Sequence, residues 1–494
     1  MKSPRRPASY CLIFFSVLQH LNAEIVGTKT VTTAGDSGPG SLRAIIASAV
    51  NGDTITFDSS LSGATIPLTS GSLTISDLVA SIDASQLTSK ITISGSGLSR
   101  LFSIAGASDI TLRNLALRDG RSTNQGGGGI LLAEGSLQMF DCVVSNCFAT
   151  YNGGGINLAL GVTATFDRCL IVGNTSTNLG FGGGFFIGGS SATTMRNCVL
   201  SGNSNPFGGG IAMANTSPTI VNCTIQGNAG GGIRCDSQSS PQLTNSILWD
   251  NYDTSGTTAA QQLKSLNNSL PATSYSLIQG AANSGSFGNG NSVAWGTGNL
   301  NGDLTESNPK FVGENYPSSS PETSRDLRLL ATSPALNVGN NPANSGTLDV
   351  AGASRIQGPT IDLGAYEGGF ATFALFYPTT SPAEDDNFNG ISNLQEYGMG
   401  FNPSSAPISQ ATPAMSYDDN GLLLTAYQRT NSLDLSPRLQ TSTSIDGDWT
   451  DVIENLHYTT ASASATNPDQ IQIVYRLITP SPRRFYRQSF LLAP

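Results

Sequence analysis

The feature that most constrains this chain is one phrase of roughly 25 residues that recurs six times between residues 110 and 251. Its marker column reads Leu115, Cys142, Cys169, Cys198, Cys223 and Ser246, with steps of 27, 27, 29, 25 and 23 residues. A Gly-Gly pair followed by Ile or Phe precedes each marker from Cys142 onward. Self-similarity at such a period is typical of solenoids, propellers and other repeat arrays.

Inside each unit, the apolar residues form short alternating runs broken by Gly, Asn and Ser, which predicts strands and turns instead of helices. Two columns are apolar in every unit and are therefore expected to face a core. They lie three residues before the marker (Leu112, Met139, Phe166, Met195, Ile220, Leu243) and two after it (Leu117, Val144, Ile171, Leu200, Ile225, Leu248).

The position just before the marker is polar and is expected to be a solvent-facing turn, where Asn tolerates left-handed geometry and can form side-chain ladders. It holds Asn114, Asp141, Arg168, Asn197, Asn222 and Asn245. Three short strands per coil predict an all-β chain whose main part is a right-handed parallel β-helix, a solenoid. A propeller is the alternative, but its blades usually need 40 or more residues.

We expect a capped solenoid followed by a small antiparallel β domain, because a solenoid needs an end cap and the last strands alternate in polarity. A short amphipathic helix from Leu42 to Ala49 suits the N-terminal cap. The predicted parts are a signal peptide (1–23), an N-terminal cap with the first coils (24–109), β-helix repeats (110–251), irregular last coils with long loops and a closing segment (252–370), a linker with a calcium-binding loop (371–410) and a C-terminal β domain (411–494).

Residues 1–23 have the pattern of a secretory signal, with Lys2, Arg5 and Arg6 before a short apolar core and Ala23 at a plausible cleavage site. The apolar core is too short to span a bilayer, and we expect no transmembrane span. The formal net charge is -10 without a basic stripe, which argues against a nucleic-acid partner. We therefore predict a protein that is secreted or held at the outer cell surface, including the cell outer membrane.

Six cysteines remain after the signal, and export permits disulfides. Four of them occupy the marker column, where Leu115 and Ser246 also stand, so packing is favoured over bridging. Cys147 and Cys235 lie outside that column, and a pairing of either one stays open.

The segment Gly-Ser-Leu-Arg-Ala-Ile (residues 40–45), followed by Gly-Asp-Thr-Ile-Thr-Phe (52–57), resembles the N-terminal region of secreted bacterial β-helix proteins. The Gly-Gly-Ile and Cys-x-Ile-x-Gly-Asn phrases resemble polymorphic outer membrane protein repeats, although those pair Gly-Gly-aliphatic with Phe-x-x-Asn. Residues 308–367 resemble the closing segment of choice-of-anchor Q proteins. These resemblances imply architecture and export, and carry no fixed activity.

A calcium loop is predicted at residues 385–396, which match the twelve-residue EF-hand pattern and are similar to loops of dockerins and thrombospondin type 3 repeats. The expected ligands are Asp385, Asn387, Asn389, the Ile391 carbonyl, Asn393 and Glu396. Gly390 allows the sharp turn. Few of these ligands are charged, so we expect a weak, structural Ca²⁺ site. The alternative is an Asn-rich interdomain turn.

No catalytic residue is predicted. The histidines are His20, in the predicted signal, and His457, so general-base chemistry in the coils would need other groups. Asp141 is expected to stack on Arg168, and Asp167 on Arg196, as salt bridges instead of a metal cluster. We therefore favour a binding, adhesion or envelope-structural protein with a glycan or cell-surface partner. A polysaccharide lyase or other carbohydrate-active enzyme is the alternative, and the oligomeric state stays open.

Two further groups are candidate sites. Trp249 and Trp295 stand near the irregular loops and are the aromatic residues that we would expect to contact a glycan. A polar set in the closing segment, formed by Asp349, Arg355, Asp362 and Glu367, is either a salt-bridged structural cap or a ligand site.

Overall fold

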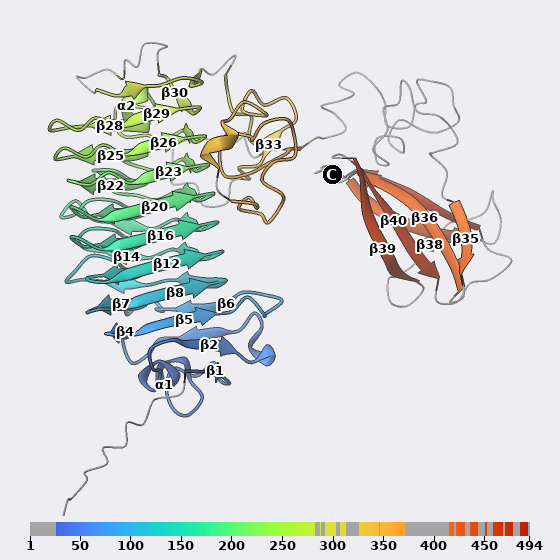
Figure 1. Ribbon diagram of the computed structural model, residues 1–494, viewed down its shortest axis with the longest axis horizontal. Helices are drawn as coiled ribbons and strands as arrows, with labels where there is room; N and C mark the ends of the chain where they lie inside the picture. The colour runs from blue at the N-terminus through green and yellow to red at the C-terminus, as the bar shows by residue number, and fades with distance from the viewer. Residues whose placement is uncertain are drawn as a thin grey trace, which may run out of the picture.

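The computed structural model describes residues 26–281, 287, 292–302, 307–312, 326–344 and 346–370, together with seven strands between residues 414 and 492. Within residues 28–302 the strands stack into a parallel β-helix (Figure 1). Each turn of the chain contributes one strand to each of three sheets, which we call sheets A, B and C. The expected solenoid is therefore confirmed.

Sheet A is the largest, with 11 parallel strands. They are β1 (Thr28–Val31), β2 (Asp53–Phe57), β5 (Val79–Asp83), β8 (Asp109–Arg113), β12 (Ser136–Phe140), β16 (Thr163–Asp167), β20 (Ala192–Arg196), β23 (Thr219–Val221), β26 (Gln242–Thr244), β29 (Ala272–Ser274) and β31 (Ala294–Trp295). The ladder pairs equivalent residues of successive coils, such as Met139 with Phe166.

Sheet B has 10 strands, and from β8 to β30 each of its strands follows the sheet A strand after one or two residues, the first of which makes the turn. They are β3 (Thr65–Pro67), β6 (Ile91–Ser94), β9 (Leu115–Arg118), β13 (Val143–Ser145), β17 (Leu170–Val172), β21 (Val199–Ser201), β24 (Thr224–Gln226), β27 (Ile247–Trp249), β30 (Leu277–Gln279) and β32 (Leu300–Gly302). The turn residue is left-handed, for example Asn114 with φ 56° and Asn222 with φ 53°. The expected turn geometry is confirmed.

Sheet C has eight strands and follows sheet B after the longer loops. They are β4 (Leu73–Ser76), β7 (Phe102–Ala105), β11 (Ile130–Leu132), β15 (Ile156–Leu158), β19 (Phe185–Ile187), β22 (Ile211–Ala214), β25 (Ile233–Asp236) and β28 (Leu263–Ser265). Three two-residue strands form a small sheet D within these loops: β10 (Arg121–Ser122), β14 (Phe148–Ala149) and β18 (Thr175–Ser176).

The core fills the space between the three sheets, and both predicted apolar columns are buried in it. The marker column is buried as well, and all six cysteines of residues 142–235 are free thiols. Burial raises the pKa of Cys169 and Cys198 well above the ordinary value, so these thiols stay protonated and inert.

A second buried column consists of asparagines whose amides stack from coil to coil. Asn203 donates from Nδ2 to the Ile171 carbonyl (2.8 Å) and to Asn228 Oδ1 (3.0 Å), and its Oδ1 accepts from both nitrogens of Asn174 (3.0 Å). Asn251 and Gln262 continue the column, and Cys147 begins it. A ladder that satisfies each buried amide in this way fixes the register of the coils.

The helix α1 (Leu42–Ala47) covers the N-terminal end of the core with Leu42 and Ile46. Ser41 caps it by accepting from Ala44 N. It ends two residues earlier than the apolar pattern predicts. A short 3₁₀ turn, η1 (Ser59–Leu61), follows β2. No helix in the described part of the chain is both long and apolar enough to cross a bilayer.

After residue 252 the coils continue to Gly302. A one-turn helix, α2 (Ala259–Gln262), leads into β28 and lets Gln262 occupy the asparagine column. The coil of Ser276 lacks both the Cys and the Gly-Gly marker, and Ser276 continues the marker column after Ser246. This substitution hides the repeat in the sequence without changing the stacking.

The closing segment, residues 326–370, does not cover the end of the solenoid. It lies along the outer side of sheet B in the later coils (Figure 1). It contains β33 (Leu329–Leu330), the 3₁₀ turn η2 (Asn341–Ala343) and β34 (Gly369–Phe370). Asn197, Asn222 and Asn245 are buried, and Asn344 and Asn340 cover the last two of them. For these turns the prediction of a solvent-facing column is wrong.

The C-terminal strands are antiparallel, as their alternation predicts. Sheets of four and three strands contain β35 (Ala414–Asp418), β36 (Gly421–Arg429), β37 (Leu435–Ser442), β38 (Thr450–Asp451), β39 (Tyr458–Asn467), β40 (Gln470–Leu477) and β41 (Phe485–Leu492).

Candidate functional site

The most distinctive exposed chemistry of the solenoid lies where the loops from sheet B enter sheet C. Three successive loops carry an aromatic residue there, and all three rings are exposed: Tyr151 by 43 %, Phe181 by 38 % and Phe207 by 38 %. In sheet C, Phe186 on β19 and Arg234 on β25 are half-buried and alternate with the buried residues that face the core. We call these five residues, together with Lys264, the aromatic edge.

The three phenylalanine rings of the aromatic edge lie close enough to form one surface. The centroids of Phe181 and Phe207 are 5.7 Å apart, and those of Phe181 and Phe186 are 6.4 Å apart. The Arg234 guanidinium carbon lies 5.6 Å from the Phe181 centroid and 5.7 Å from that of Phe207. The edge therefore combines flat apolar rings with a cation held between two of them.

Glycine explains how these loops can stack so tightly. The residue after each of the two phenylalanines has a left-handed backbone, with φ 76° at Gly182 and 98° at Gly208. A Cβ at the next residue, Gly183, would approach the Gly209 carbonyl oxygen to 2.5 Å. Glycine, which has no Cβ, tolerates both the left-handed backbone and the close approach of the next coil. The backbone amides and carbonyls of these glycines form hydrogen bonds between adjacent coils, and these bonds align the rings on successive loops.

The charges of the aromatic edge are partly balanced. Arg234 forms an ion pair of 3.0 Å with Asp236, and Lys264 stands beside Arg234 on the next strand. Burial opposes ionisation of Asp236, but hydrogen bonds from Asn267 and Arg234 outweigh it and lower the pKa of the carboxyl group. A small crevice beside Phe207 is lined by Arg234, Lys264 and Asp253, so the edge offers both cationic and polar groups.

The sequence did not single out this edge, although a signal was present. Tyr151, Phe181 and Phe207 each stand one or two residues before the glycine run of their unit. Their common position relative to the glycines becomes visible only when the units are aligned on the Gly-Gly pair instead of on the cysteine marker.

The two predicted aromatic contacts are placed differently. Trp249 is only 3 % exposed, because the closing segment covers it, so its prediction as a glycan-contacting residue is wrong. Trp295 is half-buried, with its ring 5.9 Å from that of Phe287, and lines a shallow hollow at the end of sheet A. These two tryptophans and the aromatic edge do not form one site.

The predicted ladder salt bridges are present. Arg168 Nε lies 2.7 Å from Asp141 Oδ1, and Arg196 Nη2 lies 3.8 Å from Asp167 Oδ2. In the part of the chain that the structure describes, no group of three or more His, Cys, Asp or Glu side chains is placed to hold a metal ion. The predicted calcium ligands, Asp385 to Glu396, lie outside the described residues.

The predicted polar set of the closing segment does come together, and all four side chains are buried. Arg355 Nη1 lies 3.8 Å from Glu367 Oε2, and Arg355 Nη2 donates to the carbonyls of Asp362 (3.1 Å) and Gly364 (2.5 Å). Asp349 accepts from three backbone amides. Because these groups satisfy the backbone of the segment itself, we assign them a structural role in holding it.

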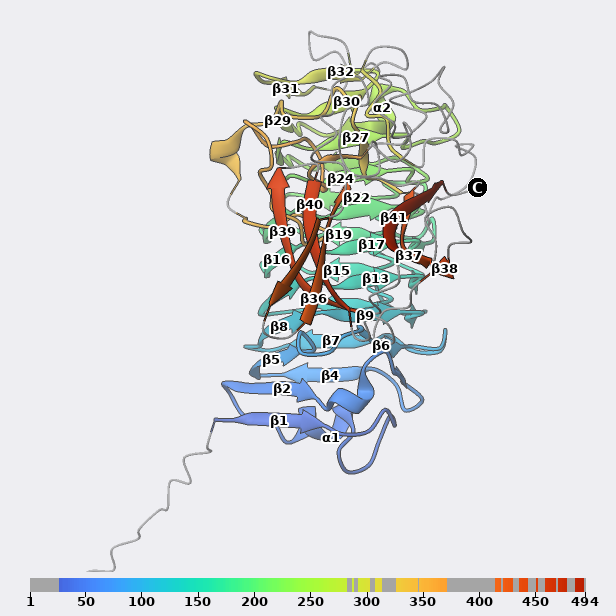
Figure 2. The same cartoon turned by 90° about the vertical axis from the view of Figure 1, so that its right-hand side faces the viewer.

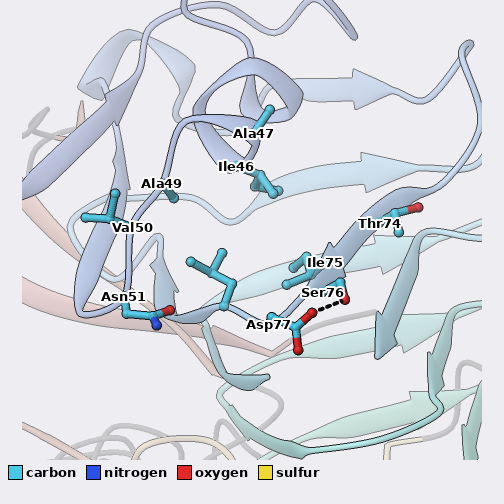
Figure 3. A pocket seen from close by; sticks show the side chains of 10 residues that line it. Ile46, Ala47, Ala49, Val50, Asn51, Thr74, Ile75, Ser76 and Asp77 are labelled. Carbon is cyan, nitrogen blue, oxygen red and sulfur yellow. Dashed lines mark hydrogen bonds between the residues drawn. The ribbon is translucent and has the colours of Figure 1, made fainter. Parts of the chain in front are cut away.

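A hollow of about 360 Å³ lies between α1 and β4 at the N-terminal end (Figure 3). It exists because β4 is the first strand of sheet C and has a neighbour on one side only. Its polar side chains already serve the fold: Asn51 accepts from Val79 N, and Asp77 accepts from Ala107 N and Ser76 Oγ. We therefore do not assign it as the functional site.

A match to a known family supports the fold of the coils. A family described as "Right handed beta helix region" matches residues 100–309. One similar solved structure is titled "Crystal structure of pectate lyase Pel9A", with 15 % sequence identity and a TM-score of 0.36, covering 69 % of this chain and 96 % of that chain. No curated protein matches the chain. A TM-score this low carries no argument about activity.

Proposed function

We propose that this chain is an exported β-helix protein that acts in binding or adhesion, or as a structural part of the envelope, at the outer cell surface or after release. Its partner would be a glycan or another cell-surface component, held at the aromatic edge. The observation that carries the proposal is the line of exposed rings at Tyr151, Phe181 and Phe207 beside Arg234.

Ring-shaped ligands suit such an edge. The apolar face of a sugar ring can stack on an aromatic ring, while its hydroxyls or acidic groups bond to nearby cations and amides. Successive coils of a parallel β-helix are about 4.8 Å apart, so the rings present a regular row to an extended chain. Tyr and Arg are among the residue types that dominate binding energy at protein interfaces, and Phe is enriched there.

The test is retention on polysaccharides. The mature chain would be passed through gels that contain acidic or neutral polysaccharides, and the shift in mobility would be measured. We expect Phe181→Ala with Phe207→Ala to weaken retention roughly tenfold or more, since each ring contributes about 1 kcal/mol or more at a binding hot spot. Leu160→Ala is the matched control, because Leu160 is 78 % exposed and lies on a different turn.

Two results would contradict the proposal. Equal retention of the double variant and the native chain would show that the rings do not contact the ligand. Release of new reducing ends or unsaturated sugars during the incubation would favour the alternative, a polysaccharide lyase or another carbohydrate-active enzyme.

We also propose that residues 385–396 bind Ca²⁺ and stabilise the chain between its two β regions. This proposal rests on the match of Asp385, Asn387, Asn389, Gly390, Ile391, Asn393 and Glu396 to the EF-hand pattern. A chelator should lower the melting temperature of the full mature chain, and Asp385→Ala should remove that sensitivity. An unchanged melting temperature of the native chain in chelator would refute it.

A further inference from the structure

One row of residues on sheet C changes in character along the solenoid. The strands β15, β19 and β22 follow one another along the axis (Figure 2), and β25 and β28 continue the order (Figure 1). At the equivalent position between two core-facing residues, these strands hold Asn157, Phe186, Ala212, Arg234 and Lys264, which pair in register. The aromatic part of the row therefore leads directly to two cations.

Arg234 and Lys264 place two like charges at adjacent positions of one sheet. Their backbones are one strand spacing apart, about 4.8 Å, and like charges directly opposite one another destabilise a sheet. The chain contains five lysines and has a net charge of -10, so a pair of cations is not a general feature of its surface. An anion between the two side chains would replace this repulsion by attraction.

Arg234 has one acidic partner but keeps an unused donor. Its Nη2 lies 3.0 Å from Asp236 Oδ2, whereas its Nε–H is buried without an acceptor among the described residues. Arg234 also lines a crevice of about 20 Å³, which has room for one water molecule. A buried N–H group without a protein partner is usually satisfied by water or by a bound ligand. The crevice therefore suits an acceptor oxygen.

Lys264 lines the same crevice, and its ammonium group forms no hydrogen bond or ion pair within the described part of the chain. The acid at this crevice, Asp253, already has donors. Its Oδ1 accepts from Ser255 N (2.6 Å), and its Oδ2 accepts from Gln261 Nε2 (3.2 Å). The crevice thus combines free cationic donors with carboxylate oxygens that are already bonded, and the complement of such a surface is an anionic group rich in acceptors.

Phe207 connects the crevice to the aromatic part of the row. It lines the crevice together with Lys264, and its ring centroid lies 5.7 Å from that of Phe181. A ligand with an acidic group in contact with Lys264 would therefore have its neighbouring ring within reach of Phe207.

We propose that the glycan held at the aromatic edge is an acidic polysaccharide, whose anionic group accepts hydrogen bonds from Lys264 and Arg234 while a neighbouring sugar ring stacks on Phe207. This inference rests on the proposed function and adds the charge and the orientation of the ligand. The chain of sugars would lie along the solenoid axis, because the rings and the cations do. The carboxylate of a uronic acid and the sulfate ester of a sugar offer the same acceptor chemistry.

Affinity electrophoresis of the full mature chain tests the charge of the ligand. The gels would contain alginate or its esterified form, which share a backbone and differ in charge, and dextran sulfate or dextran. The salt concentration would be about 0.15 M, where exposed charges more than about 8 Å apart are largely screened. We expect retention by at least one acidic polymer at a concentration roughly tenfold lower than by its neutral counterpart. Retention by alginate indicates carboxylates, and retention by dextran sulfate indicates sulfate esters.

The gels also separate the two proposals. Equal retention by the acidic and the neutral polymers, lost in Phe181→Ala with Phe207→Ala, would overturn the inference and leave the proposed function in place. No retention in any of the four gels, or retention that this double variant leaves unchanged, would overturn the proposed function itself.

Substitution of Lys264 tests the orientation of the ligand. Lys264→Met should weaken retention by the acidic polymer roughly tenfold and leave that by the neutral polymer unchanged, whereas Lys264→Arg should keep most of it. Lys310→Met is the matched control, because Lys310 is another half-buried lysine and its neighbour Phe311 packs in the cluster on sheet B. Equal losses in Lys264→Met and Lys310→Met, or no loss in Lys264→Met, would contradict the inference.

Discussion

The middle coils and the closing segment are held by opposite means. In the coils from residue 110 to 251, each residue rests on its counterpart one turn away, so every contact is repeated. In the closing segment, a single set of buried charges satisfies the backbone once, with no repetition. Repetition spreads the effect of a change over neighbouring coils, whereas a unique cluster concentrates it. Three substitutions measure this difference.

The largest effect is expected within the asparagine column. Asn203→Leu would leave the Ile171 carbonyl without its side-chain donor and both nitrogens of Asn174 without their acceptor. Unsatisfied buried groups cost about 1–3 kcal/mol each, so we expect a loss of roughly 4 kcal/mol in the free energy of unfolding. Urea unfolding of the full chain measures it. Asn178→Leu, at an exposed position, is the control; an equal effect of both variants would contradict the ladder.

The next effect is expected in the cluster. Arg355→Met removes the one facing cation of the three buried acids, and breaking a buried ion pair costs about 3 kcal/mol or more. This loss should appear in the exchange protection of residues 326–370 and not in that of the middle coils. Arg118→Met removes an exposed pair with Asp119 and should change little. A loss of protection spread evenly over the whole solenoid would show that the segment and the coils unfold as one unit.

The smallest effect is expected in the marker column. Cys198→Ser should cost about 1 kcal/mol, because Ser246 already occupies the same column and donates to Thr244 O at 3.0 Å, as Cys198 Sγ donates to Arg196 O at 3.0 Å. Thermal unfolding under reducing conditions measures it. A loss several times larger would mean that the thiol column does more than pack.

Much of the solenoid could be predicted from the sequence, because the spacing of the sequence repeat determines the register of the strands. The core columns, the left-handed turns, the ion pairs at Asp141 and Asp167 and the free thiols of the marker column follow from stacking one unit on the next. The asparagine column was not recognised, although Asn174, Asn203, Asn228 and Asn251 all end the repeated phrase. A polar residue looks exposed in a sequence, and only the coil below shows that it is satisfied inside.

The candidate site could not be predicted as well. Trp249 is predicted as a candidate glycan contact, yet the closing segment, which begins 77 residues after it in the chain, covers it. Contacts between residues so far apart in the sequence produce no repeated pattern from which they could be predicted. The four charged residues of the closing segment were recognised as a set, but their place on the side of sheet B depends on the same distant contacts.

The unequal step of the repeat has one last consequence. The strands stay in register although successive units differ by several residues in length, because the loops before sheet C absorb the difference. An inserted residue at Tyr151 or Phe207 would lengthen a loop without shifting any strand. The strands must therefore keep their spacing from one coil to the next, whereas the loops before sheet C can vary in length. These variable loops are the ones that carry the exposed rings.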